Sequence, residues 1–88
     1  MIAVVGHLVV DPAQRDRVVD LSREAVLAAR DTPGCLRFAV AADPVAEDRV
    51  NVSELWVDRD TLERFRGAGP SGELGDLVRD AVVRELEA

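Results

Sequence analysis

The chain contains no lysine and no tyrosine, and its 88 residues include a single histidine and a single cysteine. Without lysine it has neither a Schiff-base amine nor the lysine of a phosphate-binding P-loop. Cys35 has no partner for an internal disulfide, and together with His7 it falls short of the ligand set of a structural zinc site. The composition therefore excludes disulfide stabilisation within the chain and a structural zinc centre.

Positive charge is also scarce, because 11 arginines stand against 17 aspartates and glutamates and leave a net charge of -6. This balance repels a phosphate backbone and an anionic lipid surface, so we expect no nucleic-acid and no membrane partner. No apolar run approaches the roughly 20 residues of a membrane span. Residues 1–10 are apolar but lack the basic start of a signal peptide, which predicts a cytoplasmic protein.

Length and hydrophobicity indicate one small globular domain over residues 1–88, with 48% hydrophobic residues. A chain of this size buries only about 60% of the surface that its unfolded state exposes, so its own core is thin. Sharing a core with a second copy remedies this shortage. We therefore expect a homodimer.

Periodicity predicts a strand, a helix and a hairpin in the first two thirds of the chain. β-branched residues dominate 2–10, which indicates a strand, and Asp11-Pro12 is a typical helix start. The helix ends at 32–34, where Pro and Gly follow Thr. Alternating apolar residues then predict strands over 36–41 and 49–57. The apolar face of the helix comprises Val18, Leu21, Ala25, Ala28 and Ala29.

The strand over 49–57 divides its side chains between two faces. One face has Val50, Val52, Glu54 and Trp56, and the other has Asn51, Ser53, Leu55 and Val57. A buried Glu54 would have a raised pKa and act as a base, but pairing with an arginine is the more common arrangement. Arg37 on the preceding strand and Arg84 near the C-terminus are the expected partners.

The end of the chain allows two interpretations. Asp58 is expected to cap a short helix with Leu62 and Phe65 on its apolar face, followed by a glycine-rich loop or lid over 67–72. Periodicity alone then favours a helix to the end of the chain. We instead expect a short helix and a strand over 81–87, because a fourth strand covers an open sheet edge. The expected fold is α+β, a ferredoxin-like split βαβ fold with an antiparallel four-stranded sheet. Its elements follow one another along the chain in the order β-α-β-β-α-β.

Several short segments occur in a characteristic order and spacing. They are Gly6-His7-Leu8 before Asp11-Pro12, the turn Thr32-Pro33-Gly34-Cys35-Leu36, the run from Arg49 to Trp56, and Leu62-Glu63-Arg64-Phe65-Arg66. Together they resemble the antibiotic biosynthesis monooxygenase family, whose ferredoxin-like subunits form dimeric α/β barrels. The most diagnostic piece is the Glu-x-Trp of Glu54 and Trp56, and the resemblance covers nearly the whole chain.

The resemblance implies several possible activities. Members include cofactor-independent oxygenases, heme-degrading enzymes and proteins of no established activity. Heme-degrading relatives place an iron-binding His about ten residues after the Trp, where this chain has Arg66. Anthrone-oxidising relatives use a Tyr and an Asn followed four residues later by a Trp. Here Asn51 and Trp56 are five residues apart, which predicts opposite strand faces unless a bulge intervenes.

The family resemblance thus implies a cofactor-independent monooxygenase that oxidises a quinol- or anthrone-like aromatic with dioxygen. His7 is the candidate base, because its ordinary pKa lies near neutrality, and Asn51 is the candidate oxyanion donor. Trp56 is expected to form an aromatic wall. The candidates for substrate contact are Phe38, Glu54, Phe65 and Arg66.

Each candidate residue also has a structural interpretation, as a packed histidine, a loop-facing asparagine, a core tryptophan or a helix-terminal arginine. If these interpretations hold, the protein is instead a non-catalytic small-molecule-binding or stress-response dimer. We expect no resident cofactor and no metal in either case.

Overall fold

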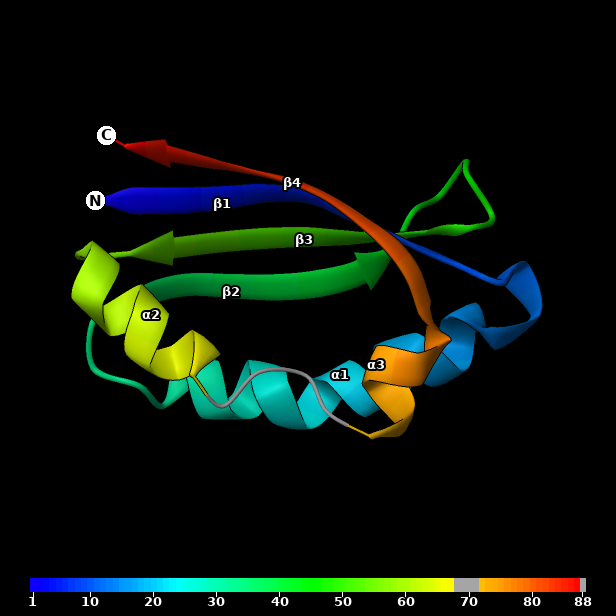
Figure 1. Ribbon diagram of the computed structural model, residues 1–88, viewed down its shortest axis with the longest axis horizontal. Helices are drawn as coiled ribbons and strands as arrows, with labels where there is room; N and C mark the ends of the chain where they lie inside the picture. The colour runs from blue at the N-terminus through cyan, green and yellow to red at the C-terminus, as the bar shows by residue number, and fades with distance from the viewer. Residues whose placement is uncertain (68–71, 88) are drawn as a thin grey trace.

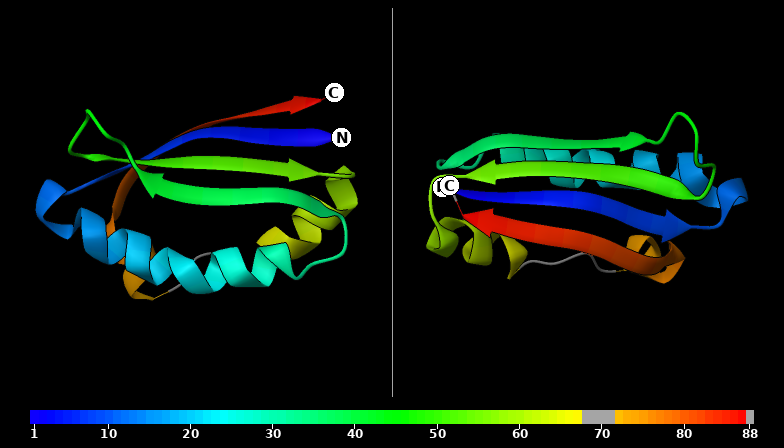
Figure 2. Two further views of the ribbon diagram at one scale, coloured as in Figure 1. Left: turned by 180° about the vertical axis from the view of Figure 1, so that it is seen from behind. Right: turned by 90° about the horizontal axis from the view of Figure 1, so that it is seen from above.

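The computed structural model describes residues 1–67 and 72–87 and contains one open sheet with all its helices on the same face (Figure 1 and Figure 2). The strand order is β2-β3-β1-β4, and every neighbouring pair is antiparallel. In chain order the elements are β1 (Ile2–Val10), the 3-10 turn η1 (Pro12–Gln14), α1 (Arg15–Arg30), β2 (Cys35–Ala42), β3 (Arg49–Trp56), α2 (Arg59–Arg66), α3 (Glu73–Leu77) and β4 (Val78–Glu87). The α+β, ferredoxin-like prediction is confirmed.

The C-terminal segment decides between the two interpretations of the sequence. α3 ends at Leu77, and β4 begins at Val78, three residues before the predicted strand, and pairs with β1 along its length. A helix to the end of the chain is therefore wrong. The expected loop or lid over 67–72 falls mainly on 68–71, which lie outside the described residues.

Side-chain caps start the helices where the sequence predicts them. The Asp11 carboxylate accepts a hydrogen bond from the Ala13 N–H at 2.9 Å, and the chain passes through η1 before α1 proper begins. Asp58 accepts from both the N–H and the hydroxyl of Thr61, at 2.8 and 2.7 Å. Each cap satisfies donors that the first helical turn leaves free.

The core lies between the sheet and the helices. Strand alternation assigns this face, which we call the helix face, to every second residue of each strand. Its members on the three covered strands are Ile2, Val4, Gly6, Leu8 and Val10 of β1, Phe38 and Val40 of β2, and Val50, Val52, Glu54 and Trp56 of β3. Val18 and Ala29 of α1 and Leu62 of α2 pack against them without exposed surface. Two expected apolar positions are instead exposed, Ala28 on α1 and Leu36 at a register irregularity in β2.

The opposite face of the sheet, the open face, is not covered by any described element (Figure 2). It exposes Val5 of β1 at 39% and Val82 and Leu86 of β4 at 50% and 51%. Apolar side chains on a sheet face normally pack against another layer. Among the described residues, no helix is long and apolar enough to cross a membrane.

Candidate functional site

The three aromatic residues of the chain form one cluster on the helix face. The ring centroids of Trp56 and Phe65 are 5.2 Å apart, those of Phe38 and Phe65 are 5.6 Å apart, and those of Phe38 and Trp56 are 6.3 Å apart. Trp56 has no exposed surface and Phe38 is 9% exposed, whereas Phe65 is only half-buried. Phe65 is therefore the ring of this cluster with surface available to a ligand.

Glu54 places a carboxyl group beside this cluster. The Trp56 Nε1–H donates to Glu54 Oε1 at 2.9 Å, and among the described residues Oε2 has no hydrogen-bond partner. Burial raises the pKa of the Glu54 carboxyl above its ordinary value, and the indole hydrogen bond and the nearby Arg66 offset only part of that effect. A half-buried carboxyl held by one oxygen, with the other unused, is suited to accept a proton from a ligand.

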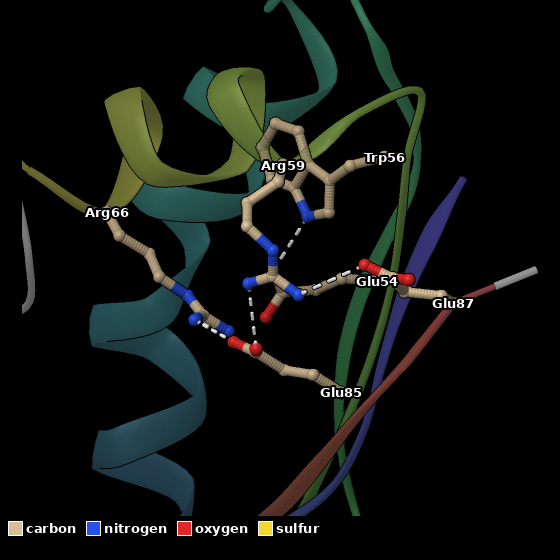
Figure 3. Close-up of polar contacts among 6 residues, drawn as sticks. All are labelled: Glu54, Trp56, Arg59, Arg66, Glu85 and Glu87. Atoms are coloured by element: carbon tan, nitrogen blue, oxygen red, sulfur yellow. Dashed lines mark hydrogen bonds and ion pairs between the residues drawn. The ribbon is translucent and has the colours of Figure 1, made fainter.

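Two arginines of α2 and two glutamates of β4 lie next to Glu54 and form what we call the ion-pair cluster (Figure 3). Arg59 Nη1 contacts Glu85 Oε2 at 3.1 Å, and Arg59 Nη2 lies 3.8 Å from Glu87 Oε1. Arg66 Nη1 donates to the other oxygen of Glu85. These hydrogen bonds, the one from Arg66 first, hold the pKa of Glu85 below its ordinary value.

His7 and Asn51 lie together, but on the open face, away from the aromatic cluster. They are directly opposite in the β1–β3 register, and His7 faces Val82 on the other side. The β1–β3 register has no bulge, so the predicted separation of Asn51 from Trp56 holds. The structure thus brings Phe38, Glu54, Trp56, Phe65 and Arg66 to one region and leaves the other two candidates behind the sheet.

The Asn51 side chain has a structural partner. Its Nδ2–H donates to Asp43 Oδ1 at 2.8 Å, at the loop between β2 and β3. The other Asp43 oxygen accepts from the N–H groups of Val45 and Ala46 at 3.0 and 2.7 Å. These bonds, led by the one from Ala46, lower the pKa of Asp43 to about 2. This is the loop-facing hydrogen bond of the structural interpretation.

The expected pairing of Glu54 with Arg37 or Arg84 is wrong. Arg37 is opposite Leu55 and Arg84 is opposite Val5, so both arginines project from the open face. Arg37 Nε donates instead to Ser53 Oγ at 3.1 Å. The arginine whose charge lowers the pKa of Glu54 is Arg66, and Arg66 is itself ion-paired to Glu85.

Arg59 and Glu85 were not among the sequence candidates, although a signal for them exists. Arg59 and Arg66 are seven residues apart, which places them two turns apart on one helix side. Glu85 and Glu87 are two residues apart in β4, so their side chains lie on the same side of the strand. The sequence therefore shows a pair of arginines and a pair of glutamates with matching spacing. It does not show that the two pairs lie close together in the fold.

Glu54 lines neither of two cavities at the surface of the protein. A cavity of about 290 Å³ at the β2 edge is lined by Arg30, Cys35, Leu36, Arg37, Phe38 and Ala39, and a shallow one by Asp60, Glu63 and Arg64. Burial raises the pKa of the Cys35 thiol, so it stays protonated and packs against the core. Within residues 1–67 and 72–87, no three His, Cys, Asp or Glu side chains are grouped to hold a metal ion.

The fold and this site define a small α+β protein with a half-buried carboxyl between an antiparallel sheet and its helices. The sequence model described as antibiotic biosynthesis monooxygenase matches residues 1–82. The chain belongs to the antibiotic biosynthesis monooxygenase family. Among curated proteins, no relative matches the sequence.

Solved structures share this fold over nearly their whole length. A protein described as an antibiotic biosynthesis monooxygenase, 25% identical, superposes with a TM-score of 0.81, covering 100% of this chain and 98% of the other. Rv0793 from Mycobacterium tuberculosis is 20% identical, with a TM-score of 0.81 and coverage of 99% and 93%. A conserved protein of unknown function from Bacteroides thetaiotaomicron, described as a possible oxidoreductase, is 14% identical, with a TM-score of 0.84 and coverage of 99% and 96%.

Proposed function

We propose that the protein is a cofactor-independent monooxygenase that oxidises an electron-rich aromatic, such as a hydroquinone or an anthrone, with dioxygen. Family membership supports the reaction class. The observation that carries the proposal is the half-buried Glu54 carboxyl, fixed by the Trp56 indole through one oxygen, while the other has no hydrogen-bond partner within residues 1–67 and 72–87. The cytoplasmic location expected from the sequence stays a prediction.

In this proposal Glu54 is the base and Trp56 positions it. A substrate ring packs against Phe65 with its acidic proton toward Glu54 Oε2, and the Arg66 guanidinium, whose charge already acts on Glu54, stabilises the oxygen that becomes anionic. His7 and Asn51 cannot reach the same ring, because the sheet lies between them and Glu54. We therefore assign proton abstraction to Glu54 rather than to His7.

The chemistry needs little from the protein, because the substrate supplies all the electrons. Removing a proton from an anthrone methylene leaves a stabilised anion that reduces dioxygen and combines with it as a peroxide anion. The protonated base returns its proton to this anion, which gives a hydroperoxide. Loss of the remaining C–H proton and cleavage of the O–O bond then give a carbonyl and water. One oxygen atom enters the product and the other leaves as water, and a single base serves all of these proton transfers.

An oxygen-uptake assay tests the proposal with a panel of hydroquinones and anthrone as probes. We expect uptake above the protein-free rate, with labelled dioxygen placing one oxygen atom in the product. Uptake equal to the protein-free rate across the panel would overturn it. Ligand binding without uptake would instead identify the non-catalytic binding dimer.

We also propose that two copies associate through their open faces, because Val5, Val82 and Leu86 are exposed there. Val82→Glu places a charge on this face and should convert a dimer to a monomer in sedimentation equilibrium. The matched control is Val45→Glu, which adds the same charge to a loop residue that is 88% exposed and should leave the dimer intact. A monomeric wild-type protein, or a dimeric Val82→Glu variant, would contradict this arrangement.

A further inference from the structure

Glu85 is the residue that organises the ion-pair cluster. Its two carboxylate oxygens are used by different arginines, Oε2 by Arg59 and Oε1 by Arg66 (Figure 3). Glu87 contacts only Arg59, at 3.8 Å. Removing the Glu85 charge would therefore leave Arg66 without a described ion-pair partner, whereas removing that of Glu87 would not.

Glu85 and Glu54 lie on the same face of the sheet, on either side of β1. Val4 is opposite Glu54 in the β1–β3 register and opposite Glu85 in the β1–β4 register. Two strand spacings, about 10 Å, separate the two backbones. Arg66 approaches from α2 and acts electrostatically on both carboxyl groups, although among the described residues it is ion-paired only with Glu85.

An arginine released from Glu85 has a nearby alternative partner in Glu54. Guanidinium groups pair strongly with carboxylates, and Glu54 Oε2 has no partner among the described residues. Such a pair would occupy the oxygen that the proposed reaction needs. It would also stabilise the ionised carboxylate and weaken it as a base.

We infer that Glu85 is a positioning residue: by bridging Arg59 and Arg66 it holds their guanidinium groups on β4 and keeps Arg66 from pairing with Glu54. The importance of this role rests on the proposed function, in which Glu54 is the base. In the part of the chain that the structure describes, the charged and titratable groups around Glu54 are Arg59 and Arg66 from α2, Glu85 and Glu87 from β4, and Cys35 from β2 (Figure 3).

The test is the titration of the Glu54 side chain by carboxyl ¹³C NMR, with the resonance assigned by its loss in Glu54→Gln. In Glu85→Gln we expect the Glu54 midpoint to fall by about one pH unit, because Arg66 moves to it and a neighbouring negative charge is lost. Glu87→Gln is the matched control and should leave the midpoint unchanged. Arg66→Gln should raise the Glu54 midpoint more in the Glu85→Gln background than in the wild-type background, because only in the former has Arg66 moved to Glu54. Equal effects in the two backgrounds would mean that the fall reports only the lost charge of Glu85, and would overturn the inference.

A folded Glu85→Gln variant with an unchanged Glu54 midpoint would overturn the inference, as would an equal fall in Glu87→Gln. If Glu85→Gln does not fold, Glu85→Asp replaces it, because a side chain one methylene shorter keeps the charge but bridges the two arginines less well. The Glu54 midpoint must then fall in Glu85→Asp, and an unchanged midpoint would again overturn the inference.

The NMR titration needs no substrate, so it separates this inference from the proposed function. A shifted midpoint without oxygen uptake would leave the role of Glu85 standing and refute the oxygenase. Oxygen uptake with an unchanged Glu54 midpoint would support the oxygenase and refute the role of Glu85. If both hold, the acidic limb of kcat/KM in Glu85→Gln should move with the NMR midpoint.

Discussion

Replacing Glu54 with glutamine is expected to slow oxidation of the aromatic substrate by about 10²- to 10⁴-fold, the usual contribution of a general base. The amide oxygen of glutamine still accepts from the Trp56 indole, so the local packing survives, but the group no longer takes up a proton. Because burial raises the pKa of Glu54, the wild-type rate should rise with pH through a midpoint above that of an exposed glutamate. The variant should lack this limb. Oxygen uptake measured from pH 4 upward tests both expectations.

Two comparisons make the Glu54 result specific. Glu63→Gln changes an exposed glutamate of the same α2 helix and should leave the rate and its pH dependence unchanged. Trp56→Phe removes the indole N–H that favours the ionised Glu54 carboxylate, so the midpoint of the pH–rate profile should be higher in this variant than in the wild type. Wild-type turnover in Glu54→Gln combined with loss of turnover in His7→Ala would move the base to the open face and refute our assignment.

The strands and helix caps were predictable because their causes are local. Alternation in β3 correctly separated Asn51 from Trp56, since no bulge interrupts its pairing with β1. Asp11 and Asp58 marked helix starts through hydrogen bonds that span only two or three residues. The fourth strand required a non-local argument, that an antiparallel sheet of three strands leaves an edge to be covered.

The partner of Glu54 was not predictable in the same way. Arg37 and Arg84 lie on strands of the sheet and match Glu54 in charge, but a shift of one residue in register moves a side chain to the other face. The observed register puts both arginines on the open face. The guanidinium that acts on Glu54 comes from α2, and the sequence does not fix how that helix lies on the sheet.

Trp56 illustrates a related gap between type and role. The sequence supports either a ligand-facing wall or a core residue, because both need a large apolar ring on the helix face. The Trp56 side chain has no exposed surface, which favours the core interpretation. Its indole N–H nevertheless donates a hydrogen bond to the Glu54 carboxyl. A single residue thus serves the core with its ring and the proposed site with its nitrogen.

Gly6 leads to the second large effect, because β4 approaches its backbone too closely for any side chain. A Cβ at this position would lie 2.1 Å from the Val82 carbonyl oxygen and 2.7 Å from the Val83 Cα. Its φ of 154° is also one that L residues rarely adopt. Both obstacles are backbone atoms of the neighbouring strand, so a rotamer change cannot relieve the contact.

We expect Gly6→Ala to lower the free energy of unfolding by about 3 kcal/mol or more, the sum of overpacking and backbone strain. Urea denaturation should show this loss, and hydrogen exchange should show it first in β4, which pairs only with β1. Gly67→Ala is the matched control, because its nearest obstacle, the Arg64 carbonyl oxygen, is 3.4 Å away and its φ is helical. That variant should be neutral or slightly stabilising. Equal midpoints for the two variants would mean that β4 does not approach Gly6 as described, and would remove the support that this strand gives to Glu85.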